Sequence, residues 1–135
     1  MDLVIERFPK SDYSIIVVKN GSVLLKNTEN NIKTLLEAID INKDDLKDST
    51  IGIDILDKAT ALLCVFSGVS GVYSSRSTKK GLAVLIRAGI PCQTDEIIID
   101  PKNSIEKHKF FYEERVSYID SPEYAYEILK EKILK

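Results

Sequence analysis

The sequence predicts an α/β protein, with an N-terminal β-hairpin followed by alternating helices and strands on one mixed sheet. Asn20-Gly21 separates the strand-like runs 13–19 and 22–26, and this dipeptide favours a tight hairpin turn because both residues accept positive φ. Residues 51–89 indicate a buried helix, a short strand and a second helix, and a further apolar run follows at 96–99. Helices that alternate with strands are typical of crossover connections in an α/β sheet.

The elements around the hairpin are short. Residues 1–12 predict an arm or a first helical turn, which Pro9 interrupts. Residues 41–50 predict a charged connector with one helical turn at 44–46. Between the hairpin and this connector, residues 30–40 predict a helix because apolar side chains recur on one face, at Ile32, Leu35, Leu36 and Ile39.

The first helix of the central unit is expected to carry Asp54, Asp57 and Lys58 in its first turn. Acids there suit the positive end of the helix dipole. Ser67-Gly68 ends this helix, and residues 69–75 alternate apolar and small polar side chains as a short strand does. The buried face of the helix is predicted from apolar residues at helical spacing, namely Ile55, Leu56, Ala59, Leu62, Leu63 and Phe66.

The second helix of the unit and the C-terminal helix have clear boundary signals. Ser77 or Thr78 is expected to cap the second helix, which ends at Gly89-Ile90-Pro91 and packs through Leu82, Leu85 and Ile86. Asp100-Pro101-Lys102-Asn103 ends the following strand, and residues 104–118 show no clear periodicity. Ser121-Pro122-Glu123 supplies an N-cap, a proline at N1 and an acid, so it predicts a helix that packs through Ala125, Ile128, Leu129 and Ile133.

The composition indicates one globular domain that spans residues 1–135. Hydrophobic residues make up 44% of the chain and charged residues 30%, and the net charge of −2 gives no general attraction to nucleic acid or anionic membrane. No apolar run approaches the roughly 20 residues that cross a bilayer, and the first residues lack the apolar core of a signal peptide. Cys64 and Cys92 make no disulfide framework. We therefore expect a cytoplasmic protein with no nucleic-acid or membrane partner.

Four segments are distinctive in combination: Val17-Val18-Lys19-Asn20-Gly21, the helix around Leu35-Leu36, residues 57–63 (DKATALL) and residues 121–126 (SPEYAY). Together and in this order they resemble an uncharacterised prokaryotic family with a cytidine-deaminase-like fold. The resemblance covers nearly the whole chain and implies the three-layer cytidine-deaminase-like fold. It implies no activity, because the family has none to carry over. It also implies an acid in the late region of the chain, where Glu113 stands.

Zinc deaminases need a His or Cys, two further cysteines and a glutamate, in an H-x-E … P-C-x-x-C pattern. The helix that would carry the first part contains Asp57-Lys58-Ala59 instead. Pro91-Cys92 is followed by Gln93-Thr94-Asp95 without a second cysteine, and the only histidine, His108, lies in a lysine-flanked polar stretch. We therefore expect no zinc and no other metal or cofactor.

The first candidate site consists of Asp54, Asp57 and Lys58. In a deaminase-like fold this helix end faces the pocket, where Lys58 would act as a base or anion ligand and Asp57 would orient the amine or keep it charged. The alternative is an ordinary Asp54–Lys58 surface ion pair.

The second candidate site is the run 74–80, which is rich in hydroxyls and cations. A strand-to-helix junction presents unpaired N–H groups to an anion, with Ser75, Ser77 and Thr78 as further donors and Arg76 as a bidentate phosphate ligand. The alternative is a solvated loop with a standard N-cap. Aromatic residues at Phe110, Phe111, Tyr112, Tyr118, Tyr124 and Tyr126 could form a stacking wall, a subunit interface or plain core packing.

Two functions remain open from the sequence. The first is a small-molecule-binding protein, either a binder or a metal-independent enzyme, whose anionic ligand carries a phosphate or carboxylate, a nucleotide being favoured by fold analogy. The second is a non-catalytic module that associates with itself or a partner through its sheet edge and aromatic patch. A homodimer is expected in either case, because a hairpin edge is often covered by two-fold pairing.

Overall fold

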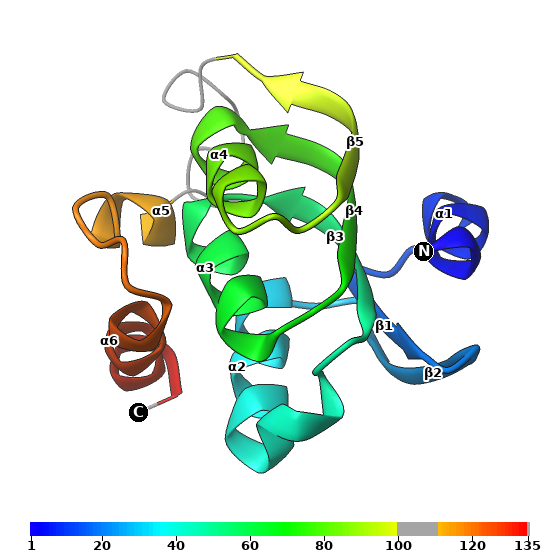
Figure 1. The fold of residues 1–135 in the computed structure, drawn as a ribbon, viewed down its shortest axis with the longest axis horizontal. Helices are drawn as coiled ribbons and strands as arrows, with labels where there is room; N and C mark the ends of the chain where they lie inside the picture. The colour runs from blue at the N-terminus through cyan, green and yellow to red at the C-terminus, as the bar shows by residue number, and fades with distance from the viewer. Residues whose placement is uncertain (100–110, 135) are drawn as a thin grey trace.

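The computed structural model describes residues 1–99 and 111–134, which contain a five-stranded mixed sheet with strand order β2-β1-β3-β4-β5 (Figure 1). β1 is antiparallel to both β2 and β3, whereas β3, β4 and β5 are parallel to one another. The predicted α/β architecture with a mixed sheet is thus confirmed. The strands are β1 (Ile15–Lys19), β2 (Ser22–Asn27), β3 (Thr50–Leu56), β4 (Gly71–Thr78) and β5 (Cys92–Ile98).

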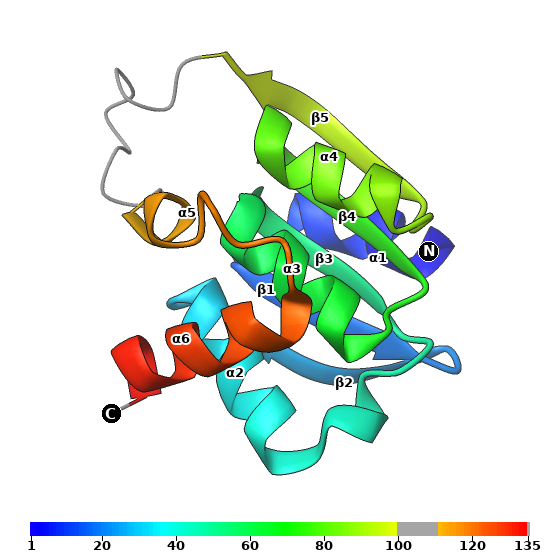
Figure 2. The same cartoon turned by 60° about the vertical axis from the view of Figure 1, so that its left-hand side comes forward.

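Helices lie on both faces of this sheet (Figures 1 and 2). One face is covered by α2 (Asn31–Asn42), α3 (Lys58–Ser67) and α4 (Lys79–Arg87). On the opposite face lie α1 (Asp2–Arg7) and the 3-10 turn η1 (Phe8–Lys10). The C-terminal segment packs outside the first helical layer. Its helix α5 (Phe111–Arg115) lies beside α3, and its helix α6 (Pro122–Leu134) packs against α2 and α3. A second 3-10 turn, η2 (Lys43–Asp45), follows α2.

The predicted hairpin is confirmed. Asn20 has φ 53° and Gly21 has φ 76°, the left-handed conformations that a type I′ turn requires. The pairing is not uniform, because Val17 faces Leu25 whereas Val18 faces Val23. Leu24 is therefore an extra residue, and this bulge leaves its side chain 49% exposed.

The main core lies between the sheet and the first helical layer. It joins buried side chains of β3, α2, α3, α4 and α6, including Ile51, Ile53, Leu35, Leu36, Leu62, Leu63, Leu85 and Leu129. A smaller cluster on the other face joins Val4 and Phe8 to Ile16, Val18 and Tyr73, with the Phe8 and Tyr73 rings edge to face at 6.0 Å. The second cluster explains why the N-terminal turn is ordered, since it covers apolar side chains that the sheet would otherwise expose.

The prediction of a helix beginning within residues 51–56 is wrong, because these residues form β3. β3 pairs with β1 on one side and β4 on the other, which fits the β-branched alternation of Ile51, Ile53 and Ile55. α3 begins only at Lys58. The apolar spacing suggested one long helix because the last apolar residues of the buried strand β3 happen to continue the helical spacing of the apolar residues in α3.

Two further boundaries differ from the prediction. β4 extends to Thr78, so residues 76–78 belong to a strand and not to a loop, and β5 begins at Cys92, four residues earlier than expected. Thr78 caps α4 as predicted, since its hydroxyl accepts from the Gly81 N–H. Ile86, expected in the core, is 68% exposed. The predicted end of this last strand at 100–103 lies outside the described residues.

Candidate functional site

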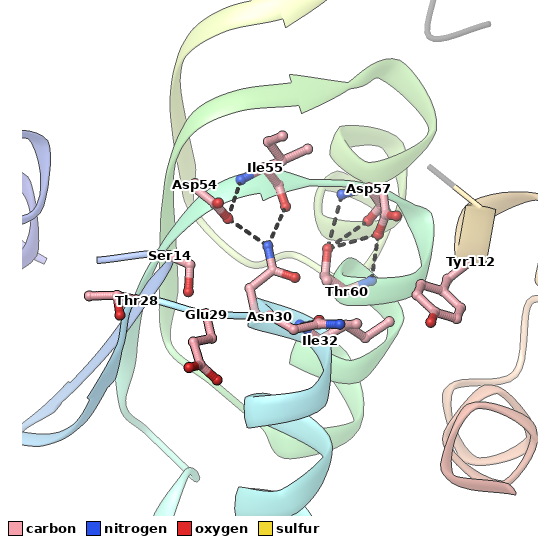
Figure 3. A pocket seen from close by; sticks show the side chains of 11 residues that line it. Ser14, Thr28, Glu29, Asn30, Ile32, Asp54, Ile55, Asp57, Thr60 and Tyr112 are labelled. Atoms are coloured by element: carbon pink, nitrogen blue, oxygen red, sulfur yellow. Dashed lines mark hydrogen bonds between the residues drawn. The ribbon is translucent and has the colours of Figure 1, made fainter. Parts of the chain in front are cut away.

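A pocket of about 420 Å³ opens at the carboxyl end of β3, beside the N-termini of α2 and α3 (Figure 3). In sheets of this kind, ligands usually bind beyond the carboxyl ends of the strands. The volume suits a small organic molecule. The lining residues are Ser14, Thr28, Glu29, Asn30, Asn31, Ile32, Asp54, Ile55, Asp57, Thr60 and Tyr112.

Asp54 lies near the end of β3 and not on a helix, so Asp54 and Lys58 are not the ion pair within one helix that was the alternative interpretation. Its Oδ1 accepts hydrogen bonds from Asn31 Nδ2 at 2.6 Å and from the Ile55 N–H at 2.8 Å. The Asn31 amide also donates to the Ile55 carbonyl at 3.3 Å. These bonds fix the carboxylate between β3 and the start of α2.

Asp57 is the N-cap of α3. Its Oδ1 accepts from the Thr60 N–H at 2.8 Å and from the Thr60 hydroxyl at 3.0 Å, while the Asp57 N–H donates to the Thr60 hydroxyl at 2.9 Å. This is a capping box with threonine in the place of the usual glutamate. The arrangement holds the Asp57 side chain rigidly at the pocket wall.

Burial raises the pKa of Asp57 from an ordinary 3.8 to about 7. The hydrogen bond from the Thr60 N–H acts in the opposite direction, and the nearby negative charge of Glu113 raises the pKa further. The result is unusual for a helix cap, because a helix N-terminus favours the charged form. A carboxyl group in this state can both accept and donate a proton near neutral pH.

The buried Glu113 side chain connects α5 to the N-termini of α3 and α4. Its Oε1 accepts from the Lys58 N–H at 2.8 Å, the first backbone donor of α3, and from the Thr78 hydroxyl at 2.6 Å, the cap of α4. The Glu113 side chain is buried and comes from α5. The chain's own carboxylate therefore lies between the two helix N-termini at which the sequence suggested an external anion.

Gly81 allows α4 to approach this junction. A Cβ at Gly81 would lie 2.8 Å from the Asp57 carbonyl carbon and 2.9 Å from its oxygen. Glycine is therefore required where the first turn of α4 contacts the backbone of the α3 cap.

Lys58 is directed toward the C-terminal segment. Its Nζ donates to the Ser117 carbonyl at 2.9 Å and lies 3.5 Å from Asp120 Oδ1. The Lys58 residue is only 7% exposed, whereas the Asp120 side chain is 87% exposed. In this arrangement Lys58 links α3 to the chain between α5 and α6, and it does not line the pocket.

The predicted anion-binding run is divided by the strand. Arg76 lies on β4 with its Nε 3.9 Å from Glu96 Oε1 on β5, and Ser75 is half-buried on the same strand. Ser77 is buried; its hydroxyl contacts the Ser74 hydroxyl and donates to Thr94 Oγ1 at 2.9 Å. Of the predicted residues, the structure thus brings Asp57, Thr78 and Glu113 together around the Lys58 backbone, and it places Ser75, Ser77 and Arg76 elsewhere.

The aromatic side chains that the structure describes do not form one wall. Tyr112 lines the pocket, Tyr126 stacks on Phe66 at 4.8 Å, and Tyr118 and Tyr124 are exposed. Phe110 lies outside the described residues, as does His108.

Sequence reasoning missed Asn31, Thr60 and the pocket wall formed by Ser14, Thr28 and Glu29. The Asp57-x-x-Thr60 spacing was the one available signal, because it resembles a capping box. Within residues 1–99 and 111–134, no group of three His, Cys, Asp or Glu side chains is arranged to hold a metal ion. Cys64 is buried, which raises the pKa of its thiol to about 12.

The fold and the pocket define the chain as a mixed α/β protein with a polar site at the carboxyl end of its sheet. The family model described as TM1506, domain of unknown function (DUF1893), matches residues 3–133. The chain belongs to this family. No curated protein matches the sequence, and no helix in the described part of the chain is long and apolar enough to span a bilayer.

A crystal structure of a DUF1893 family protein (TM1506) from Thermotoga maritima, at 2.70 Å resolution, is similar to this chain. The TM-score is 0.81 at 20% sequence identity, over 97% of this chain and 88% of the other. The similarity supports the fold along almost the full sequence.

Proposed function

We propose that the protein binds a small polar molecule in the pocket at the carboxyl end of β3 and that Asp57 exchanges a proton with it. The observation that carries the proposal is the buried Asp57 carboxyl, which lines the pocket and has a pKa raised to about 7. Perturbed carboxyl groups in clefts are common at functional sites. The proposed chemistry is not zinc-dependent deamination, because the sequence lacks the zinc-deaminase ligand pattern.

A purely structural cap is the simpler explanation for Asp57, and two features favour a functional role over it. A cap is most effective when it is charged, because it then complements the helix dipole. Asp57 is instead buried beside a second carboxylate, which opposes its charge. Burial and repulsion of the Asp57 charge lower the stability of the folded chain, whereas an asparagine or serine cap would not have this cost.

The analogy with cytidine-deaminase-like folds supports a nucleotide-like ligand, as a proposal from fold alone. The hairpin, the helix–strand alternation and the site at the sheet's carboxyl end agree with it. The position of Glu113 affects the anionic ligand that the sequence suggested at the N-termini of α3 and α4. An anionic group that binds at the Lys58 N–H and Thr78 would have to displace Glu113 from both.

The proposal is tested by amide NMR spectra of the protein titrated with nucleosides, amines, sugar phosphates and plain phosphate. Thr28, an exposed residue of the pocket wall, is changed to tryptophan to fill the pocket; Ser22→Trp, an exposed site outside it, is the control. We expect at least one compound to shift the amides of Ile55 and Thr60, and Thr28→Trp alone to abolish that effect. If no compound shifts these amides, or if Thr28→Trp binds like the wild type, the proposal is wrong.

Self-association is the second candidate function, and a specific surface favours it. A groove of about 380 Å³ lies between β2 and α2, lined partly by Leu24, Leu25, Ala38, Ile41 and Leu46. Leu24 is 49% exposed and Ile41 is 84% exposed. Apolar side chains gathered around a groove often mark an interaction site.

A further inference from the structure

We infer that the α5 segment, residues 111–117, is a pH-sensitive switch: it stays docked on the N-termini of α3 and α4 while Asp57 carries a proton, and it is released when Asp57 ionises. This switch requires no ligand and so goes beyond the proposed function. Its release would also change the pocket wall, because Tyr112 belongs to the α5 segment and lines the pocket beside Asp57 and Thr60 (Figure 3).

The α5 segment is docked through the backbone and the side chain of one lysine. The Lys58 N–H, the first backbone donor of α3, donates to Glu113 Oε1 at 2.8 Å, and Lys58 Nζ donates to the Ser117 carbonyl at 2.9 Å. Glu113 Oε1 also accepts from the Thr78 hydroxyl at 2.6 Å, and Val116 is fully buried. The position of α5 therefore depends in part on a carboxylate held at the N-terminus of α3.

Asp57 stands at the same helix end. It is the N-cap of α3, one residue before the N–H that donates to Glu113, and the two acids are only 4% and 6% exposed. Two carboxyl groups in one buried site cannot both ionise without a large cost in free energy. A proton on Asp57 allows both to stay, and the rise of the Asp57 pKa to about 7 agrees with this geometry.

Other titratable groups surround Asp57. Lys58 directs its amine away, to the Ser117 carbonyl and to Asp120 Oδ1 at 3.5 Å. Cys64 stays a neutral thiol near pH 7, because burial raises its pKa to about 12. The charge of Glu113 raises the pKa of Asp57, so the ionisation of Asp57 acts on α5. The remaining groups lie on the pocket wall or are exposed on α4 and α5, and they are Glu29, Asp54, Tyr112, Lys79, Lys80, Glu114 and Arg115.

The sign of the pH dependence follows from the proton that the docked state holds. Docking is strongest below the ordinary pKa of Asp57 and weakens as the pH rises to about 7. Release of α5 returns the Asp57 and Glu113 carboxylates to water. Since α5 has five residues in the described part of the chain, its release disturbs far less structure than unfolding of α3, whose Leu63 lies in the main core.

The experiment measures backbone order from the nuclear relaxation of amide nitrogens at pH 5.5 and pH 8, with no ligand present. We expect residues 112–117 to be rigid at pH 5.5, with order parameters of about 0.85, and to fall below about 0.6 at pH 8. Leu63 should stay near its pH 5.5 value. Asp57→Asn and Asp57→Ser keep an N-cap that cannot ionise, so both should hold the α5 segment rigid at both pH values. Glu114→Gln, a change at an exposed acid of the same helix, should behave like the wild type.

Three results would overturn the switch. The first is an α5 segment that keeps its order at pH 8 in the wild type. The second is an α5 segment that loses order at pH 8 in the two Asp57 variants as it does in the wild type. The third is a loss of order at Leu63 together with the α5 segment, which would mean that the whole chain unfolds. Because these measurements contain no ligand, such a failure leaves the pocket proposal to its own compound panel.

Discussion

The proton on Asp57 links the candidate site to the stability of the folded chain. In the folded state its pKa is raised from 3.8 to about 7 by burial, so between these pH values the folded chain holds a proton that the unfolded chain has lost. The contribution of Asp57 to the free energy of unfolding is therefore fully present below about pH 4 and is lost as the pH rises to about 7. A difference of about three pKa units corresponds to roughly 4 kcal/mol.

We predict that Asp57→Asn removes most of this pH dependence. Asparagine is also a good N-cap, so the helix keeps its cap without the titrating proton. Urea unfolding at pH 5, 6, 7 and 8 measures the effect; Asp12→Asn, a change at an exposed acid, should retain the wild-type profile. Equal slopes in Asp57→Asn and wild type would show that Asp57 does not titrate in this range.

The contacts of Glu113 show how secondary-structure elements far apart in the sequence are joined. Its bond to the Lys58 N–H spans 55 residues and its bond to Thr78 spans 35. Since Glu113 is buried, its removal would leave two donors without their partner inside the protein. Each such bond to a charged group contributes roughly 1.5–3 kcal/mol.

We predict that Glu113→Ala lowers the free energy of unfolding by about 2–4 kcal/mol. The value is less than the sum of two bonds because the repulsion between Glu113 and Asp57 is also removed. The neighbouring Glu114 is exposed, so Glu114→Ala should change stability by less than about 0.5 kcal/mol. Urea unfolding at pH 7 compares the two; equal effects would contradict the bridging role.

We predict that Gly81→Ala destabilises the protein, although alanine is the better helix former by about 1 kcal/mol. The added Cβ would lie 2.8 Å from the backbone of Asp57, which cannot move without disturbing the α3 cap. The expected loss is about 1–3 kcal/mol, as for other overpacked contacts. Lys80→Ala, on the exposed side of the same turn, serves as the control in thermal unfolding. A stabilised Gly81→Ala would show that α4 adjusts freely.

The elements with local signals could be predicted from sequence. Asn20-Gly21 defined the hairpin, and the caps of α4 and α6 were visible in Thr78 and Ser121. β3 could not be separated from α3, because a buried strand with partners on both sides lacks the polar alternation that marks a half-exposed one. Of the pocket wall only Asp54 and Asp57 were predicted, and the contacts of Asp54 and Glu113 were not, because their partners are 23 to 55 residues away and leave no periodic pattern.

The edges of the complete sheet influence how two copies could associate. β2 is one edge strand, and its bulge at Leu24 together with Lys26 opposes flat strand pairing. β5 is the other edge and carries Asp95 and Glu96. Bulges and charges of this kind are common protections against edge-to-edge pairing. An association through the groove beside α2 is therefore more compatible with the fold than one through the open edges.

We predict a homodimer that buries this groove against a second copy. Size exclusion with light scattering should give a mass above the 15.2 kDa of one chain. Ile41→Asp should give a monomer, because the change places a charge at the centre of an apolar contact without touching the core; Ile41 is already 84% exposed. Tyr118, 99% exposed on the chain between α5 and α6, provides the matched change Tyr118→Asp, which should leave the dimer intact. A monomeric wild type at high concentration, or a dimer that survives Ile41→Asp, would exclude the groove as the interface.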